Sequence, residues 1–332
     1  MKKFFASFLS AILVVVVLSS CTPSQTNVGQ SQNYFTTTTS QQTTSYTPIG
    51  YGVGCPYFDE SNFKYEGEPV ELLFEIAPED VQMAIVIFVD GFLQPYSING
   101  GEIGYFHKAS TGLYTLRFTP VSGRAGENVQ FVLRGLKGIE IDNPENQSLD
   151  VDEYRLMTNE HSMQSICSFD LKMEVDAPVL SPEVADDLTY IQDIEEMFSY
   201  AGVAIDDMHW TDFRIYDTVL TAQEDKADPG RITRIIVQKD TEHEIFICGY
   251  GKTGKYRVSL FINNELQYAF DGKAYLDMEI VENKQTTCSV KINTEGLNKN
   301  NYIYLLYCPL DIETDRISYH ASKTYTTMLL VE

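Results

Sequence analysis

Two stretches of the sequence share one pattern, in which an apolar run is followed by a pair of turn-forming residues and a second short run. Phe88–Gln94 reads FVDGFLQ, and Phe261–Gln267 reads FINNELQ, 173 residues further along the chain. A two-residue type I′ turn needs positive φ at both central positions, which Asp, Asn and Gly tolerate better than other residues. Each stretch therefore predicts the tip of a β-hairpin, and we interpret the Asp-Gly pair as turn chemistry rather than as part of a reactive site.

The offset of 173 also relates the residues around these turns. It aligns Leu72 with Ile245, Phe74 with Ile247, Ile85 with Val258, Ile87 with Leu260, Val129 with Tyr302, Phe131 with Tyr304 and Leu133 with Leu306, whereas Leu116 and Phe118 align with Val290 and Ile292 at 174. In both copies the apolar residues recur at a period of two, which is typical of β-strands with one buried face. The pattern predicts that one sheet-built unit is duplicated, with coincidence between two β-rich stretches as the alternative.

Each half is predicted to hold about seven short strands, with a turn signal near every ten residues. This organisation resembles that of immunoglobulin-like β-sandwiches. The resemblance is architectural, because the first half has no Cys, Trp, Cys triple with the family spacing and the single tryptophan, Trp210, precedes the second repeat. It implies an all-β protein of two tandem immunoglobulin-like β-sandwich domains, expected at 51–178 and 179–332, with small barrels and other sandwiches as alternatives.

The segment between the halves predicts a linker followed by one short helix. Residues 176–187 read DAPVLSPEVADD, and two prolines with flanking acids are typical of an interdomain linker. Asp187 is a suitable helix N-cap and Gly202 a suitable stop. Between them, five apolar residues recur at helical spacing: Leu188, Ile191, Ile194, Met197 and Phe198. We expect this helix to pack on the second sandwich.

The first twenty residues resemble the signal peptide of bacterial membrane lipoproteins. Two lysines precede the apolar run Phe4–Leu18, which is too short for a full membrane span, and the run closes on the sequence LSSC, which resembles the lipobox. The resemblance implies cleavage after Ser20 and a thioether-linked diacylglycerol on Cys21, with further acyl chains such as palmitate making the anchor stable. The expected location is the cell membrane, facing its extracellular or periplasmic side. An ordinary signal peptide with an incidental cysteine is the alternative.

Residues 21–50 are expected to form a disordered stalk, because the tract TTTTSQQTTS (Thr36–Ser45) has no apolar residues to bury. As a flexible coil, these residues would span on the order of 30 Å. Removing residues 1–20, which contain two lysines and no acids, changes the formal net charge from −23 to −25. Nucleic acid is therefore not expected as a partner, since phosphate binding needs a basic footprint.

Five cysteines remain besides Cys21, an odd number for an exported chain. Cys248 precedes the second hairpin and Cys308 follows the strand YIYLLY, a placement that resembles the bridge between the sheets of an immunoglobulin-like domain. Cys55 with Cys167 could join the first and last strands of the first half. These two pairs are the candidate disulfides, and the alternative is that all five thiols are buried and reduced.

No motif in the sequence predicts a catalytic residue, a cofactor or a metal ion. Gly249–Lys255 has the glycine spacing of a P-loop, but Tyr256 stands in the Ser/Thr position and the following residues alternate as a strand. We interpret this stretch as a glycine-rich connection between strands. The five histidines lack metal-ligand spacing, the acidic clusters do not follow the EF-hand loop, and neither G-x-S-x-G nor H-E-x-x-H occurs. We therefore expect no enzyme activity.

These features favour a lipid-anchored cell-surface protein that acts in binding, adhesion or envelope assembly. Twenty-one tyrosines supply amphipathic surface suited to glycans or proteins, so an extracellular protein or a glycan is the expected partner, besides the membrane that holds the anchor. Two alternatives stay open. One is a glycan-binding accessory lipoprotein of a polysaccharide-use system. The other is an envelope hydrolase with a site between the domains, which needs a deep cleft with clustered ionisable groups of perturbed pKa.

Overall fold

The structure is a computed structural model that describes residues 52–55, 58–77, 83–136, 163–193, 211–217, 234–282, 284–310, 322–324 and 327–332. The predicted signal peptide, the lipidation of Cys21 and the stalk lie outside these residues. In the part of the chain that is described, no helix is both long and apolar enough to cross a membrane. The described elements are strands, apart from one 3-10 turn, η1 (Glu60–Asn62), which is capped by the Asp59 side chain.

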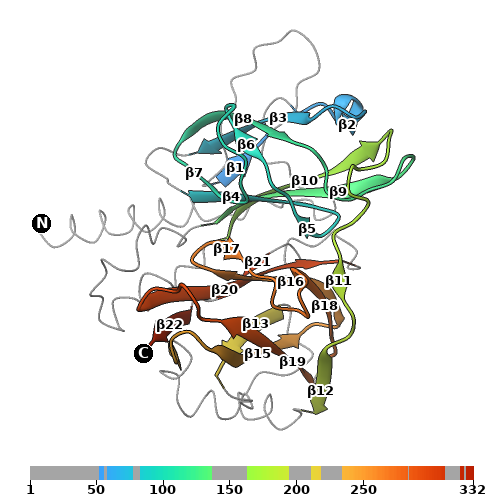
Figure 1. Ribbon diagram of the computed structural model, residues 1–332. Coiled ribbons are helices and arrows are strands. Elements are labelled where there is room, and N and C mark those ends of the chain that lie inside the picture. Colours follow the sequence, from blue (N-terminus) through green and yellow to red (C-terminus); the bar gives the residue numbers. More distant parts are fainter. Residues whose placement is uncertain are drawn as a thin grey trace, which may run out of the picture. The chain divides into compact units, whose positions relative to one another are not determined.

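The first half of the chain forms two sheets that pack face to face (Figure 1). The smaller sheet has the order β1 (Gly52–Gly54), β3 (Val70–Ala77), β8 (Gly112–Phe118), β6 (Ser97–Ile98). The larger sheet has the order β2 (Lys64–Tyr65), β10 (Met163–Met173), β9 (Asn128–Leu136), β4 (Met83–Val89), β5 (Phe92–Leu93), and β7 (His107–Ala109) also pairs with β4.

The second half also forms two sheets. Its smaller sheet has the order β12 (Thr189–Asp193), β19 (Lys284–Asn293), β15 (Glu242–Gly251), β13 (Thr211–Tyr216). Its larger sheet has the order β11 (Val184–Ala185), β18 (Tyr275–Ile280), β16 (Gly254–Ile262), β20 (Asn300–Pro309), β22 (Thr327–Val331), β14 (Arg234–Val237), with β17 (Glu265–Leu266) on β16 and β21 (Ser322–Lys323) on β20.

Both halves share the core of an immunoglobulin-like sandwich, with strands A, B and E in one sheet and C, F and G in the other. In the second half these are β13, β15 and β19, and β16, β20 and β22, while β12, which precedes them in the chain, pairs with β19 at the edge. In the first half, β1, β3, β8 and β6 take the places of strands A, B, E and D, while β4, β9 and β10 take those of C, F and G. A further short strand pairs parallel with the last one in each half, β2 with β10 and β14 with β22. The predicted fold class, an all-β protein with two tandem immunoglobulin-like sandwiches, is confirmed by this topology. The predicted domain limits at 51–178 and 179–332 stay predictions.

The two hairpin tips have the predicted conformation. Asp90 and Gly91 have φ of 53° and 75°, and Asn263 and Asn264 have φ of 50° and 64°, so all four lie in the left-handed region. The strands beside each tip, β4 with β5 and β16 with β17, pair antiparallel. Since a type I′ turn requires this backbone at both central positions, each pair is turn chemistry, as the sequence predicts.

One part of the repeat alignment is wrong by a residue. In the first half Ile87 pairs with Leu133, and in the second half Leu260, which corresponds to Ile87, pairs with Leu305. Leu133 therefore corresponds to Leu305 at an offset of 172, not to Leu306. The alignments of Val129 with Tyr302 and of Phe131 with Tyr304 fail for the same reason. A slip of one residue moves a side chain to the other face of a sheet, and indeed Leu133 belongs to the first core whereas Leu306 lies outside the second core.

Each sandwich has its own core, built from the alternating residues of the strands. Ile85, Ile87 and Val89 of β4 lie in the first core, and Val258, Leu260 and Ile262 of β16 lie in the second. The alternate residues of both strands are buried too, on the opposite face of the sheet. Strands buried on both faces read as continuous apolar runs, and they show that each larger sheet is covered on its outer side as well.

The helix predicted after the linker is wrong for residues 189–193, which form strand β12. This strand pairs antiparallel with β19, where Thr189 lies opposite Cys288 and Ile191 opposite Thr286. The run Thr189-Tyr190-Ile191 has the β-branched and aromatic residues that suit a strand, and pairing satisfies the open edge of β19. Ile194, Met197 and Phe198 lie outside the described residues.

Candidate functional site

A third apolar cluster joins residues of the two sandwiches, and we call it the junction. It holds the outer-face residues of β4, β9, β16, β18 and β20 together with the short run after the first hairpin tip: Ala84, Val86, Phe88, Phe92, Leu93, Val132, Phe261, Ala274, Tyr275, Tyr302, Tyr304, Leu306 and Cys308. The two larger sheets are thus covered by each other on their outer sides, which explains why β4 is apolar on both faces and why Ser259 and Phe261 on the outer face of β16 are buried. Burial of this kind stabilises by roughly 25 cal/mol for each Å² of apolar surface removed from water.

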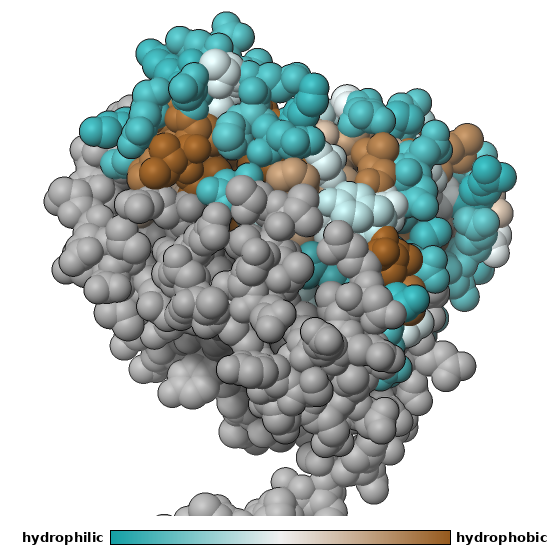
Figure 2. Space-filling model, turned by 90° about the horizontal axis from the view of Figure 1, so that it is seen from below, coloured by the Kyte–Doolittle hydropathy of each residue, from teal (hydrophilic) through white to brown (hydrophobic). Residues whose placement is uncertain are grey.

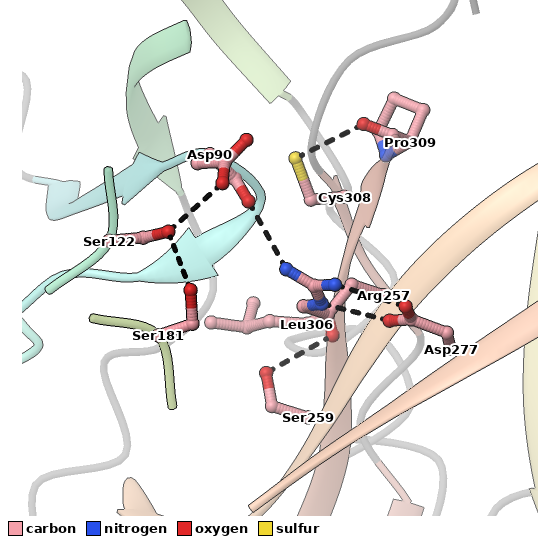
Figure 3. Close-up of polar contacts among 9 residues, drawn as sticks. All are labelled: Asp90, Ser122, Ser181, Arg257, Ser259, Asp277, Leu306, Cys308 and Pro309. Carbon is pink, nitrogen blue, oxygen red and sulfur yellow. Dashed lines mark hydrogen bonds and ion pairs between the residues drawn. The ribbon is translucent and has the colours of Figure 1, made fainter. Parts of the chain in front are cut away.

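Arg257 on β16 fixes the tip of the first hairpin at the junction (Figure 3). Its Nε and Nη2 atoms donate to the two carboxylate oxygens of Asp277, over 2.8 and 3.0 Å. Its Nη1 atom donates to the backbone carbonyl of Asp90 over 3.2 Å, and its guanidinium carbon lies 3.7 Å from the centroid of the Phe92 ring. One planar side chain therefore bonds within its own sheet and to the neighbouring sandwich.

The carboxylate of Asp90 has a structural partner of its own. Ser122 Oγ donates to Asp90 Oδ2 over 2.9 Å, and the Ser122 and Ser181 hydroxyl oxygens lie 3.4 Å apart (Figure 3). The backbone N–H of Asp90 donates to Gln130 O over 2.8 Å. The Asp-Gly tip thus connects the hairpin to the first sandwich and, through Arg257, to the second.

Arg134 on β9, two residues after the junction residue Val132, is a buried charge that sequence reasoning missed. Its side chain is 1% exposed, and its Nε and Nη1 atoms have no hydrogen-bond partner. Burial lowers its pKa from the usual 12.5 to about 10, and the nearby Tyr307 and Cys308 oppose that shift. Burial likewise raises the pKa of the Cys308 thiol to about 12. The one sequence signal for this site is a charge inside the run FVLRG, which is otherwise apolar.

A groove of about 520 Å³ opens beside the junction and is lined by residues of both sandwiches. The first sandwich contributes Tyr105, Phe106 and Lys108, and the second contributes Asn264, Glu265 and Tyr268. Tyr268 is 67% exposed. Burial raises the pKa of Tyr105, and the hydroxyl of Tyr268 adds to that shift, so the two tyrosines lie near each other although they come from different sandwiches.

The groove is held in shape by aromatic packing and by one hydrogen bond. The Phe106 ring meets the Phe261 ring edge to face, with centroids 5.1 Å apart. The Tyr304 hydroxyl donates to Asn264 Oδ1 over 2.8 Å, which fixes the side chain at the second hairpin tip. Edge-to-face contacts of this kind add about 0.5–1.5 kcal/mol beyond area burial. These contacts restrain the side chains of Phe106 and Asn264 before any ligand arrives.

Surface apolar residues elsewhere are dispersed. On the face drawn in Figure 2, hydrophobic residues of the described part form separate patches bordered by hydrophilic ones. Leu73 and Leu113 are exposed on the paired strands β3 and β8, whereas Ile236 is exposed on β14 of the other sandwich. Dispersed exposed apolar residues are common on soluble proteins and do not mark a binding site.

The predicted disulfide between Cys248 and Cys308 is contradicted. Cys248 lies on the outer face of the smaller sheet, packed with Tyr216, whereas Cys308 lies in the junction on the outer face of the larger sheet. The core separates the two thiols, so they cannot bond. Cys248 instead contacts the polar side chains of Thr287 and Gln285.

The predicted pair Cys55 and Cys167 stays a prediction, but the structure brings the two residues together. Both are buried in the first core, and their side chains are hydrogen-bonded to each other. Burial raises the pKa of the Cys55 thiol well above its usual range, and Cys167 raises it further.

The P-loop-like stretch is a connection between strands, as predicted. Gly249 and Gly251 belong to β15 and Gly254 begins β16, so no helix follows the glycines. Gly249 lies opposite Phe213, and a Cβ on it would stand 2.6 Å from the Phe213 ring and from Ile280 Cδ1. Packing therefore explains this glycine. In the described ranges, no three His, Cys, Asp or Glu side chains are arranged to hold a metal ion. The expected absence of a metal and of a cofactor stays a prediction.

No protein-family model matches the chain, and no curated protein matches it. Among solved structures, it is similar to fibronectin(III)-like modules of CbhA from Clostridium thermocellum, with 8% identity, 81% of this chain and 88% of that chain covered, and a TM-score of 0.22. A protein of unknown function from Porphyromonas gingivalis W83 has 9% identity, coverage of 80% and 92%, and a TM-score of 0.23. The human seminal-plasma complex of zinc 2-glycoprotein and prolactin inducible protein has 16% identity, coverage of 29% and 86%, and a TM-score of 0.24. Likenesses this weak carry no argument, and the immunoglobulin-like fold rests on the strand order alone.

Proposed function

We propose that this protein is a lipid-anchored surface protein whose paired sandwiches bind an extracellular ligand in the groove between Tyr105 and Tyr268. Cys21 carries diacylglycerol in this proposal, and residues 21–50 form the stalk that holds the sandwiches away from the membrane. The role is binding, adhesion or envelope assembly without catalysis. The observation that carries it is the groove itself, where half-buried and exposed aromatic rings and polar side chains from both sandwiches meet.

A glycan is the ligand class that the groove favours. A sugar presents apolar C–H faces beside hydroxyl groups, so it needs aromatic surface together with hydrogen-bonding groups. The aromatic surface comes from Tyr268 and Phe106. The hydrogen-bonding groups come from Asn264, Glu265 and Lys108. The formal net charge, −23 for the full chain and −25 without residues 1–20, favours a neutral glycan over a polyanionic one, because like charges repel. This supports the role of a glycan-binding accessory lipoprotein, with an extracellular protein as the other partner.

The same lining speaks against the hydrolase alternative. Glycoside hydrolysis uses two carboxyl groups on opposite sides of the bond that is cut. Among the described residues that line the groove, Glu265 has the one carboxylate. A binding role needs no second carboxyl group, so the residues that line the groove suffice for binding but not for this hydrolysis.

An array of neutral polysaccharides, followed by titration calorimetry on the best binder, tests the proposal. The variant Tyr268→Ala is expected to bind about tenfold more weakly, since one aromatic contact contributes about 1 kcal/mol or more. Tyr190→Ala is the matched control, because Tyr190 is also partly exposed but lies on β12, outside the groove. If no polysaccharide or envelope protein binds, or if both variants bind like the wild type, the proposal fails.

A further inference from the structure

Cys55 and Cys167 occupy places that connect the two sheets of the first sandwich. Cys55 directly follows β1, the edge strand of the smaller sheet, and Cys167 lies within β10 of the larger sheet. Both side chains are buried in the first core, where they are present as thiols that are hydrogen-bonded to each other. A covalent link here would tie the first strand of the sandwich to its last long strand.

We propose that Cys55 and Cys167 form an intramolecular disulfide in the exported protein. Each thiol loses its proton, the two sulfurs form one bond, and the two electrons pass to the disulfide of an external thiol–disulfide oxidoreductase, which becomes a dithiol. Burial opposes formation of the thiolate in the folded state, so the bond forms while the chain is folding and both sulfurs are still accessible.

The other three cysteines of the described residues lie in three different environments. Cys288 lies in the second core, Cys308 in the junction, and Cys248 on the outer face of the smaller sheet. Cys248 and Cys288 occupy neighbouring strands, β15 and β19, but their side chains leave opposite faces of the sheet. A disulfide needs Cβ atoms only about 3.5–4.5 Å apart and facing each other, which these three positions do not offer. They supply internal controls within the same chain.

The position of the bridge also suits a tethered protein. β1 pairs with β3 through three residues only, Gly52 to Gly54, and the chain preceding it leads to Cys21. If Cys21 is lipidated as proposed above, any pull on the head enters through this short edge strand. A bond at Cys55 would pass that load to β10, which pairs along most of its length with β9.

Alkylation of the exported full chain, purified in detergent and unfolded without reductant, tests the disulfide directly. Mass spectrometry is expected to show three modified thiols at Cys248, Cys288 and Cys308, and a peptide containing Cys55 joined to one containing Cys167. Modification of all five thiols, or a link between any other pair, overturns the inference. This readout does not depend on ligand binding, so it is separate from the test of the groove.

Thermal melting with and without reductant supplies the second measurement. Reduction is expected to lower the melting midpoint of the wild type by roughly 5–10 °C, because the bridge closes a loop of about 110 residues. Cys167→Ser should be insensitive to reductant, whereas the control Cys288→Ser should keep the full shift. Equal shifts in both variants overturn the inference. If Cys167→Ser does not fold, the alkylation of the wild-type chain still shows whether the disulfide is present.

Discussion

The guanidinium of Arg257 covers the ring of Phe92 at 3.7 Å while its Nη1 atom bonds to the carbonyl of Asp90, so one side chain of the second sandwich binds two residues of the first hairpin tip. In the part of the chain that is described, the side chains of the corresponding tip bond within the second sandwich. There, Asn263 Nδ2 donates to Asn301 Oδ1 and Asn264 accepts from Tyr304, both within the same sandwich. The two turns therefore differ in role: the first joins the sandwiches, and the second lines the groove.

Arg257→Ala is expected to destabilise the junction by about 2–3 kcal/mol, because it leaves Asp277 mostly buried without its cation and removes the contact with Phe92. Urea unfolding measures the change. Arg117→Ala is the control, since Arg117 is exposed and lies 3.7 Å from Glu71; its change should stay within about 0.5 kcal/mol. Equal effects of the two substitutions would contradict the role assigned to Arg257.

Gly249→Ala is expected to destabilise the second sandwich by about 1–3 kcal/mol through overpacking, because its Cβ would meet the Phe213 ring at 2.6 Å. Gly104→Ala is the control: its nearest neighbour would be His107 Nε2 at 3.6 Å, an ordinary contact. Denaturant midpoints of both variants give the measurement. An unchanged midpoint for Gly249→Ala would mean that packing does not explain this glycine.

The sequence predicts the hairpins well because their turn residues act locally. Asp90-Gly91 and Asn263-Asn264 can adopt positive φ whatever surrounds them, and the structure confirms both turns. The alignment of β9 with β20 failed because β20 is apolar on both faces. The alternation of its residues therefore does not show which of them point into the core. Tyr302 and Leu306 face the junction and Ile303 and Leu305 the core, yet all four are buried.

The candidate site could not be predicted for a related reason. The groove forms where Tyr105 and Tyr268 approach each other from different sandwiches, and no local pattern encodes how two sheets meet. The helix expected from Leu188 onwards failed similarly: pairing with the open edge of β19 overrode the helical spacing of the apolar residues. The pairing of Cys248 with Cys308 was predicted by analogy with immunoglobulin-like domains. Whether two cysteines can pair depends on the face of the sheet from which each side chain projects, and these two project from outer faces of different sheets.

Stability is expected to fall as the pH rises above about 9. Burial raises the pKa of Cys288, Cys308 and Tyr302 to about 12 each. These pKa values in the folded protein lie above the values of 9.0 for Cys and 10.0 for Tyr in the unfolded chain, so the unfolded chain releases these protons at lower pH. The stabilisation is therefore present in full below pH 9 and is lost as the pH approaches 12. The lowered pKa of Arg134 changes stability in the opposite direction, because the folded protein loses this proton at lower pH than the unfolded chain does. It is one group, whereas Cys288, Cys308 and Tyr302 all have raised pKa values.

Melting midpoints measured from pH 7 to 11 check this expectation, provided that the thiols are kept from oxidation. Cys308→Ala should flatten the decline between pH 9 and 11, because it removes one of the groups responsible. A midpoint that stays level or rises over this range would contradict the assignment.

Arg134→Met is expected to stabilise the protein by about 1–2 kcal/mol. The guanidinium is 1% exposed and two of its donor atoms have no hydrogen-bond partner, so its desolvation cost is poorly compensated. Replacing a buried charge by an apolar side chain of similar length is often neutral or stabilising for that reason. Methionine also fits an irregular space between strands, since its side chain is flexible.

Differential scanning calorimetry of Arg134→Met should show a melting midpoint raised by roughly 2–6 °C. Arg117→Met is the control, because Arg117 is exposed on β8 and its replacement should leave the midpoint nearly unchanged. A large loss of stability in Arg134→Met would mean that the buried charge is compensated within the folded protein, and its lowered pKa would then need another cause.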